Sequence, residues 1–376
     1  MTKPVITPYQ FNSYTSQITD IYVALEDELF LQIANHLKAP AEQGKDYVLQ
    51  WQVDKMKQLR MLNQETIHAL SETTGIAAEI IEKTINDVGF KSIQSIDDEV
   101  AKAKYQRKPV PTEIDKVLES YVKQTFLELD NFVNQTLITT NYGEGTVTRM
   151  YRKIVEETTA RVLAGNKTIN QAVADTVIKW AEKGIDTGFI DKGGRAWQLE
   201  QYADTVIRNT VNNTYNELRL SRMDAYGLDL VLVNSYADPR PACAKIQGNV
   251  CSMSNPSSDP KYPSIYEFGY GEPWGIRGVN CRHILYPFIE GLNTNNQIQY
   301  DENKMREQYK LSQEQRYYER QVRKAKRSLS LAEEIGDEAT IAKYKTLVRN
   351  RQAKVREFVA EYDLARRYDK ERVIRS

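Results

Sequence analysis

Apolar side chains recur every three or four residues along most of the chain, which is the spacing of amphipathic helices. The first such stretch predicts a helix from about Thr15 to Lys38, which must stop before Pro40. Its single apolar stripe consists of Ile18, Ile21, Tyr22, Leu25, Leu29, Ile33 and Leu37. The acidic run Glu26, Asp27 and Glu28 falls largely off this stripe.

Shorter helices are expected to follow, each ended by a local stop signal. One covers about residues 46–62, with Val48, Trp51, Met56 and Leu59 as candidates for burial. Asn63 is expected to cap the next helix, which runs through His68 and closes at Gly75. A further helix over residues 76–88 ends at Gly89, since glycine is common just past a helix end.

The central region repeats the helical pattern more strongly. A helix that starts at Pro111 and Thr112 has a wide apolar face suited to a bundle, formed by Ile114, Val117, Leu118, Tyr121, Val122, Phe126, Leu129, Phe132 and Val133. After a loop at 141–145, one helix is ended by Gly165 and the next is capped by Thr168. A long helix from Gln198 to Tyr226 then leads to a buried strand at 228–233.

Residues 184–195 are rich in glycine and could be mistaken for a phosphate-binding loop. The GxxxxGK[ST] pattern is absent, so residues 191–195 are expected to form a surface turn. The C-terminal part predicts two long helices, 313–328 and 340–365, which lack glycine and proline. Gly336 is expected to turn one helix back along the other as a hairpin.

The segment from Asn234 to Leu292 differs from the rest, because it holds all three cysteines, one of three histidines and most of the prolines. Cys243, Cys251, Cys281 and His283 supply three sulfurs and one nitrogen, a donor set that suits tetrahedral zinc. The usual C-x2-C spacing is missing. The spacing therefore favours the alternative, in which the cysteines are small buried hydrophobes and His283 bonds to neighbouring backbone.

The same segment holds a set of polar residues of catalytic type, namely Asp238, Arg240, Gln247, Asn280, Arg282 and His283. A histidine near an arginine and an acid can act as a general base in a hydrolase or nuclease-like site. The competing interpretation is structural: these side chains would form a local ion pair and satisfy buried loop amides. Polar clusters more often have the structural role.

Three runs in this segment, ADPRPACAKIQGNV, KYPSIYEFGYG and GIRGVNCRHILYPF, resemble the signature of phage minor capsid proteins, the Mu F-like head morphogenesis and phage minor capsid protein 2 family. The matching positions are Arg240, Pro241, Gln247, Gly248, Tyr262, Pro263, Gly269, Gly271, Asn280, Cys281, Arg282, His283, Tyr286 and Pro287. Pro239, Ile246 and Cys243 depart from the residues usual in that family. The opening, Trp51 with Gln52, and the tail are also similar.

This resemblance implies a virion component of a tailed phage of Gram-positive bacteria. Such a protein would lie in the inner capsid near the portal and act in head morphogenesis or DNA delivery. Its expected partners are the portal protein, other head proteins and packaged DNA. The other hypothesis is an enzyme or toxin that uses Asp238, Arg240, Gln247 and His283. Relatives with effector domains carry them beyond the signature, whereas here a helical hairpin follows, so the structural role is favoured.

Composition sets the outer bounds of these interpretations. The chain has 376 residues and 51 basic against 51 acidic side chains, so its net charge gives no sign of nucleic-acid binding. Three cysteines fit a reducing cytosol better than secretion, and the start lacks a signal-peptide core. No run reaches the roughly 18 apolar residues of a membrane helix. We expect synthesis in the host cytoplasm and packing into a particle.

The charge is unevenly distributed, because residues 301–376 hold 20 lysines and arginines against 14 acidic residues. Candidates for contact with DNA phosphates are Arg323, Lys324, Lys326, Arg327, Arg349, Arg351, Lys354 and Arg356. Charged helical faces are usually only solvated, so this alternative stays open.

Taken together, the patterns predict a mainly α, multi-domain protein. The expected parts are a helical N-terminal region (1–110), a central long-helix region (111–227), a small α+β signature domain (228–295) and a basic C-terminal helical hairpin (296–376). Zinc is the one cofactor that the residues suggest.

Overall fold

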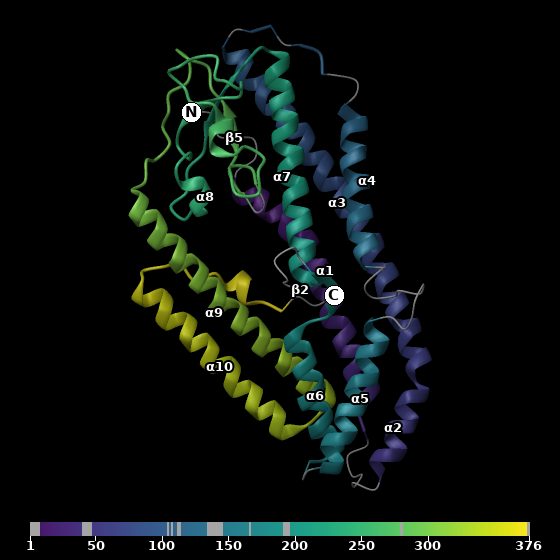
Figure 1. Ribbon diagram of the computed structural model, residues 1–376. Helices are drawn as coiled ribbons and strands as arrows, with labels where there is room; N and C mark the ends of the chain where they lie inside the picture. Colours follow the sequence, from purple (N-terminus) through teal and green to yellow (C-terminus); the bar gives the residue numbers. More distant parts are fainter. Residues whose placement is uncertain are drawn as a thin grey trace. The chain divides into compact units, whose positions relative to one another are not determined.

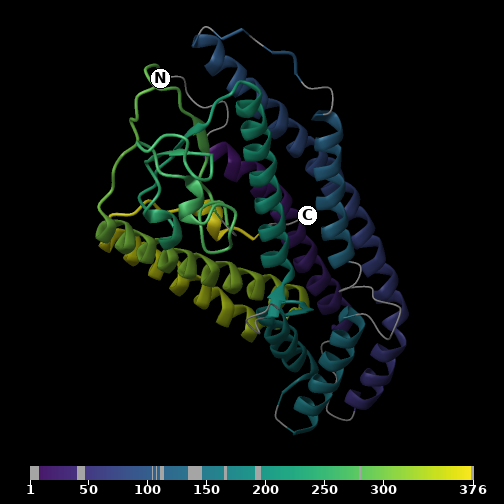
Figure 2. The ribbon, with the colours of Figure 1, turned by 45° about the horizontal axis from the view of Figure 1, so that its top comes forward.

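The computed structural model describes residues 8–39, 47–103, 105–106, 108–110, 114–133, 146–164, 167–190, 196–278 and 281–373 (Figures 1 and 2). The chain divides into two compact units that are interleaved in sequence. Unit 1 comprises Met1–Ile18, Ala78–Glu128 and Asp204–Gln313, and unit 2 comprises Thr19–Ala77, Leu129–Ala203 and Glu314–Ser376. Several long helices therefore begin in one unit and end in the other.

Unit 2 is built mainly from helices. Its elements are most of α1 (Pro8–Leu37), α2 (Val48–Lys57), the start of α3 (Leu59–Lys102), α5 (Thr146–Ala164), α6 (Ile169–Lys183), most of α9 (Glu302–Ile335), α10 (Glu338–Glu361) and the short η4 (Tyr368–Glu371). A two-stranded antiparallel ribbon, β1 (Asp186–Ile190) with β2 (Ala196–Gln198), lies between α6 and the next helix in sequence. The sequence pattern did not predict this ribbon.

Unit 1 contains the rest of α3, most of α4 (Ile114–Val133) and most of α7 (Leu199–Ala225), together with a small sheet. The sheet has the antiparallel order β4-β3-β5, formed by β4 (Val250–Ser252), β3 (Leu230–Val233) and β5 (Leu285–Pro287). Central β3 is the strand expected at 228–233, and three of its four residues are buried. Helix α8 (Pro241–Ala244) and the 3₁₀ turn η3 (Ile265–Phe268) lie in its connections.

The expected helix breaks at Asn63, Gly75 and Gly89 were wrong, because α3 runs through all three as one helix of 44 residues. A glycine costs a helix about 1 kcal/mol relative to alanine, which tertiary packing can offset. At Gly89 the reason is visible: a Cβ there would lie 2.3 Å from Leu118 Cδ2 of α4. Gly89 therefore lets α4 approach α3 closely, whereas Gly75 has nothing within 4 Å.

The acidic pair of α1, predicted to lie off the apolar stripe, is buried in unit 2. Glu26 and Asp27 are 2% and 7% exposed. Glu26 accepts a hydrogen bond from the backbone N–H of Ile185 at 2.7 Å, and both carboxylates form ion pairs with Arg327 of α9. The pattern alone could not reveal this, since the partner cation lies 300 residues away in sequence.

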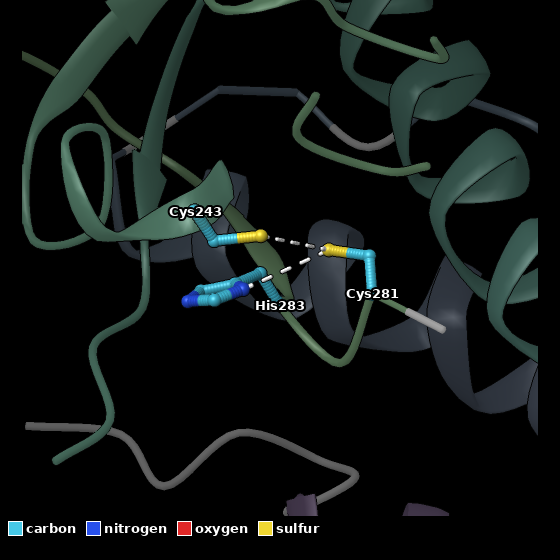
Figure 3. A group of neighbouring side chains, drawn as sticks. All are labelled: Cys243, Cys281 and His283. Atoms are coloured by element: carbon cyan, nitrogen blue, oxygen red, sulfur yellow. Dashed lines mark hydrogen bonds between the residues drawn. The ribbon is translucent and has the colours of Figure 1, made fainter. Parts of the chain in front are cut away.

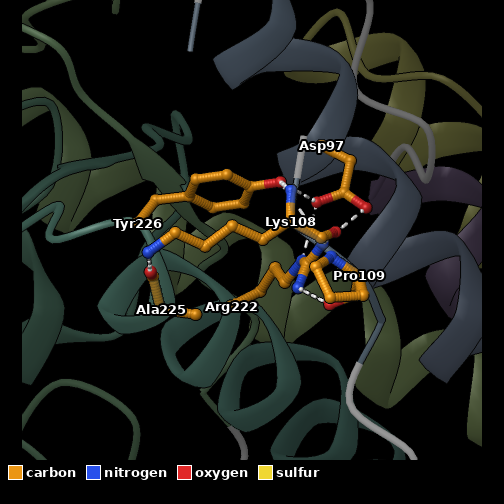
Figure 4. Close-up of polar contacts among 6 residues, drawn as sticks. All are labelled: Asp97, Lys108, Pro109, Arg222, Ala225 and Tyr226. Atoms are coloured by element: carbon orange, nitrogen blue, oxygen red, sulfur yellow. Dashed lines mark hydrogen bonds and ion pairs between the residues drawn. The ribbon is translucent and has the colours of Figure 1, made fainter. Parts of the chain in front are cut away.

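In unit 1, a polar cluster joins the ends of α3 and α7 (Figure 4). The Arg222 guanidinium forms a bidentate pair with Asp97, at 2.6 and 3.0 Å, and donates to the backbone carbonyls of Lys108 and Pro109. The Tyr226 hydroxyl donates to the same carboxylate at 3.0 Å. One buried arginine thus holds the connection after α3 against the C-terminal end of α7.

The predicted helix cap at Thr168 and the predicted turn at Gly336 were confirmed. Thr168 forms a full capping box with Gln171 at the start of α6. Gly336, with φ of 82°, turns the chain between α9 and α10, and Asp337 accepts from the Thr340 backbone N–H at the start of α10. Both ribbon views show α9 and α10 side by side as a hairpin.

The mainly α fold class is confirmed, with a small three-stranded antiparallel sheet in the signature region. Among the helices that the structure describes, none is long and apolar enough to span a bilayer. The expected loop at 141–145, the helix stop at Gly165 and the turn at 191–195 lie outside the described residues. The four-part domain division stays a prediction.

Alanine substitutions at the two glycines of α3 should have opposite effects. We expect Gly75→Ala to raise the free energy of unfolding by about 1 kcal/mol, because exposed helical glycine is unfavourable. Gly89→Ala should lower it by about 1–3 kcal/mol, because Leu118 and its buried neighbours must shift. Urea titrations of both variants measure the difference, and equal effects at both sites would contradict the close approach of α4.

Candidate functional site

The signature segment encloses a compact hydrophobic core within unit 1. Side chains from α3, α7, the sheet and the loops form it, including Ile96, Val100, Met223, Val231, Val233, Cys243, Ile246, Cys251, Ile265, Ile276, Cys281 and Leu285. All three cysteines of the chain are therefore buried, and each is a free thiol. The signature segment therefore shares one hydrophobic core with α3 and α7.

Glycines close the irregular loop that precedes the Cys281–His283 pair. A Cβ at Gly275 would lie 2.0 Å from the carbonyl oxygen of Gly269, and one at Gly278 would lie 2.1 Å from that of Glu272. Gly269 itself has φ of 67°. Because these contacts are with backbone, larger residues do not fit.

Cys243, Cys281 and His283 converge on one point in the core (Figure 3). Cys243 comes from α8, and the other two come from the segment just before β5. The Cys243 and Cys281 sulfurs are 3.9 Å apart, and Cys281 Sγ lies 3.7 Å from His283 Nδ1. Their donor atoms all fall within 4.8 Å of one another, and the three residues are at most 5% exposed.

Gln247 holds the His283 ring from its other side. Its carboxamide is oriented by the backbone of Tyr236: Oε1 accepts from the Tyr236 N–H at 3.0 Å, and Nε2 donates to the Tyr236 carbonyl at 2.9 Å. Oε1 also lies 3.1 Å from His283 Nε2. An acceptor at that position places the proton of neutral imidazole on Nε2, so Nδ1 faces Cys281 with its lone pair.

The Cys243 and Cys281 sulfurs form a hydrogen bond with each other. The hydrogen bond with Cys243 holds the pKa of Cys281 well below its usual range. The same hydrogen bond, and then burial, raise the pKa of Cys243. Arg240 lies nearby, with Nη2 3.4 Å from Cys243 Sγ and 2.8 Å from the carbonyl oxygen of Gly275.

The fourth predicted zinc ligand, Cys251, is not in this group. It sits on β4, opposite Val231 of β3, and is fully buried in the core. Burial raises the pKa of its thiol to about 12. Cys251 is a small buried side chain in the apolar core, as in the alternative to zinc binding. Cys243 and Cys281 instead lie in a polar cluster with His283.

The residues of the enzyme hypothesis have mainly structural partners in unit 1. Asp238 lies 3.5 Å from Arg282 and accepts from the Ser312 hydroxyl at 2.9 Å. Arg240 and Gln247 bind backbone groups, as described above. The His283 ring is 2% exposed and packs edge-on against Tyr236 at 5.1 Å between ring centroids. Asn280 lies outside the described residues.

The sequence interpretation missed two buried asparagines of α7 that support the site. Asn212 donates to the Cys281 carbonyl at 2.7 Å, and Asn216 accepts from the Leu285 N–H at 3.3 Å. They are 5% and 0% exposed. Their spacing of four residues on one helix face was the available signal, since asparagine is an unfavourable interior helix residue.

The candidate DNA contacts fall into two groups on the C-terminal hairpin. On α9, Arg323 and Lys326 donate to the backbone carbonyls of Lys370 and Glu371, Lys324 reaches the Glu182 carbonyl at 3.5 Å, and Arg327 pairs with the acids of α1. On α10, Arg349, Lys354 and Arg356 are exposed and Arg351 is half-buried. Lys354 pairs with Glu357 at 3.1 Å.

The chain matches a known protein family over nearly its whole length. Residues 6–360 match the family described as phage minor capsid protein 2. The chain belongs to this family. The match covers both structural units and all the candidate site residues, so the resemblance of the signature is confirmed over nearly the whole chain. As a phage structural protein, a member of the phage minor capsid protein 2 family is part of the virion and has other virion proteins as partners.

Two curated relatives of this minor capsid protein are also phage structural proteins. The chain is similar to a structural protein of Lactococcus phage LL-H, with 38% identity over 362 residues that cover 94% of this chain and 98% of the relative. A structural protein of Lactococcus phage mv4 is 47% identical over 120 residues, which cover 32% of this chain and 98% of that protein. No solved structure matches the chain.

The stability of the signature domain should depend on pH through Asp229, just before β3. Partial burial alone would raise the Asp229 pKa, but hydrogen bonds from Ser252, Ser258 and Ser254 hold it below its usual value. Its stabilisation is therefore complete above the unfolded pKa of about 3.9 and is lost as the pH falls through the lower folded value.

We expect Asp229→Asn to lower the free energy of unfolding by about 1–3 kcal/mol at pH 7, because hydrogen bonds to a charged group are lost. The difference from wild type should shrink below about pH 4. Urea titrations at a series of pH values test this. Asp224→Asn, at an exposed position of α7, is the matched control and should change stability by less than about 0.5 kcal/mol. A pH-independent effect of Asp229→Asn would contradict the charged role.

Proposed function

We propose that this minor capsid protein lies at the inner side of the phage head, attached to the portal, and acts in head morphogenesis or DNA delivery. The observation that carries the proposal is the collinear match of nearly the whole chain to a phage structural protein. The signature between Arg240 and Pro287, which resembles that of Mu F-like head-morphogenesis proteins, supports the position near the portal. A long-helix scaffold without a membrane-spanning helix among its described parts suits such a role.

The enzyme hypothesis receives no support from the site geometry. A general base must reach a substrate proton directly or through one water molecule. His283 is buried, and its two ring nitrogens face Gln247 and Cys281. Asp238 and Arg240 bind other groups of the same domain.

We also propose that α10 supplies the surface that faces packaged DNA. Residues 339–356 contain six lysines and arginines and no acidic residue. The basic residues of α9 that were candidates instead bind groups within unit 2, as described above. Exposed lysines and arginines on a helix suit phosphate contacts that do not depend on sequence. The expected partner surface on α10 is formed by Lys343, Lys345, Arg349, Arg351, Lys354 and Arg356.

Quantitative mass spectrometry of purified, DNase-treated particles tests the portal assignment. Peptides of the portal and major capsid proteins serve as internal standards. We expect this chain at low copy, in a fixed ratio to the portal protein and far below the major capsid protein. A copy number that follows the major capsid protein would place it on the shell instead, and its absence from intact particles would end the proposal.

The role of α10 can be tested by removing three of its charges. We expect the triple variant Arg349→Gln, Arg351→Gln and Arg356→Gln to bind duplex DNA more weakly. The slope of log K against log salt concentration should fall by up to about 3 units, because each phosphate contact contributes about 0.9. Fluorescence anisotropy over a salt series measures both quantities.

A matched control removes the same charge from the start of α9. Lys304, Arg306 and Lys310 are exposed there and are interleaved with acidic residues. Replacing all three by glutamine changes the net charge by the same amount. An equal loss of affinity in this control would show a non-specific charge effect and contradict a dedicated α10 surface.

A further inference from the structure

The buried group of Cys243, Cys281 and His283 has the dimensions of a metal site. A tetrahedral zinc ion with Zn–S of about 2.3 Å and Zn–N of about 2.0–2.1 Å sets its ligands about 3.8 Å apart for sulfur pairs and about 3.6 Å apart for sulfur and nitrogen. Two of the three ligand pairs here are separated by 3.9 Å and 3.7 Å, and all three donor atoms lie within 4.8 Å of one another. We propose that these three residues bind one zinc(II) ion, a property that goes beyond the proposed role in the virion.

The environment of His283 is that of a metal-ligating histidine. Such a ring usually donates its second N–H to a carbonyl or carboxylate oxygen, which fixes the tautomer and the ring orientation. Gln247 Oε1 takes this place at 3.1 Å from Nε2, and the Tyr236 backbone fixes which end of the carboxamide is the oxygen. Nδ1 is therefore directed at the sulfurs with its lone pair available. Gln247 is a positioning residue in this site.

The charge balance also favours a divalent ion. Two thiolates and a neutral imidazole carry a charge of −2, which zinc(II) neutralises, so the occupied site can be buried without net charge. The donors are soft sulfur and borderline nitrogen, which suit zinc better than magnesium or calcium. Arg240 Nη2, 3.4 Å from Cys243 Sγ, can donate to a bound thiolate.

The site would join two parts of the domain that are far apart in sequence. Cys243 belongs to α8, and Cys281 and His283 precede β5, at a separation of 38 residues for the cysteine pair. Three protein ligands are the number found in zinc sites that leave one position to a water molecule or another small ligand. Cys251 is outside the ligand set, in contrast to the set that the sequence suggests.

The first measurement is the metal content of the full-length wild-type protein, purified without chelator and measured by elemental mass spectrometry. We expect one zinc ion per chain, released together with two thiols when a mercurial reagent is added. Protein without metal should regain one equivalent of zinc and a higher midpoint of thermal unfolding. Three free thiols with no zinc uptake would overturn the proposal. A disulfide between Cys243 and Cys281 would also overturn it, since it needs the sulfurs to close to about 2.05 Å.

Variants then test the ligand set itself. Cys243→Ala, Cys281→Ala and His283→Ala should each lose stoichiometric zinc, whereas the matched control Cys251→Ala removes an equally buried thiol and should keep it. Gln247→Ala should retain the site with about 10–100-fold weaker affinity. Cobalt(II) substitution reports the number of bound thiolates by its sulfur charge-transfer absorption, so it remains informative if a variant fails to fold. Loss of zinc in Cys251→Ala, or a spectrum that indicates three thiolates in wild type, would reject this ligand set.

Discussion

The small domain depends on one constraint: its irregular backbone is buried, and its peptide groups must find hydrogen-bond partners within the protein. One face of α7 supplies them. Asn212, Asn216 and Arg219 bind the backbone of residues 281–285, and Arg222 binds that of 108 and 109. These four residues are all at most 5% exposed. Their spacing of three and four residues aligns them as a polar stripe along the buried side of the helix.

This stripe explains how an irregular segment can carry a defined site. Asn212 and Asn216 of α7 form hydrogen bonds with the backbone of Cys281 and of Leu285, the first residue of β5. These bonds fix the backbone positions from which the Cys281 and His283 side chains extend. Arg219 is 1% exposed, and its guanidinium lies near the Tyr215 and Tyr286 rings, 5.1 and 5.6 Å from their centroids. Removing a buried cation from such a network leaves its partners unsatisfied, which costs more than the loss of one surface pair. The site and the domain core are therefore stabilised by the same helix face.

In unit 2, the basic residues of different segments have different roles. Arg327 of α9 neutralises two buried carboxylates of α1, and Arg367, from the segment after α10, forms a bidentate pair with the buried Glu319. These charges stabilise the packing of the hairpin within its unit. Most of the basic residues of α10 are exposed. Charge counts along the sequence do not separate these two groups, because both helices are rich in arginine and lysine.

The sequence by itself determined the elements whose signals lie within a few residues. The capping box at Thr168, the turn at Gly336 and Asp337, the long helix before residue 226 and the short buried strand after it follow from local backbone preferences and apolar periodicity. The family signature was also readable, because its residues lie in three short runs. These features need no knowledge of distant contacts.

Tertiary structure decided what local signals cannot specify. Local preferences predict that α3 ends at its glycines, yet the helix continues through them. At Gly89 the absence of a side chain makes room for Leu118 of α4. Glu26 and Asp27 are buried because a cation arrives from α9, 300 residues later in the chain. Cys243 joins Cys281 and His283 while Cys251 does not, since strand register and the α7 contacts set which side chains meet across the core. Spacing in the sequence lists the possible ligands, but packing between distant segments selects among them.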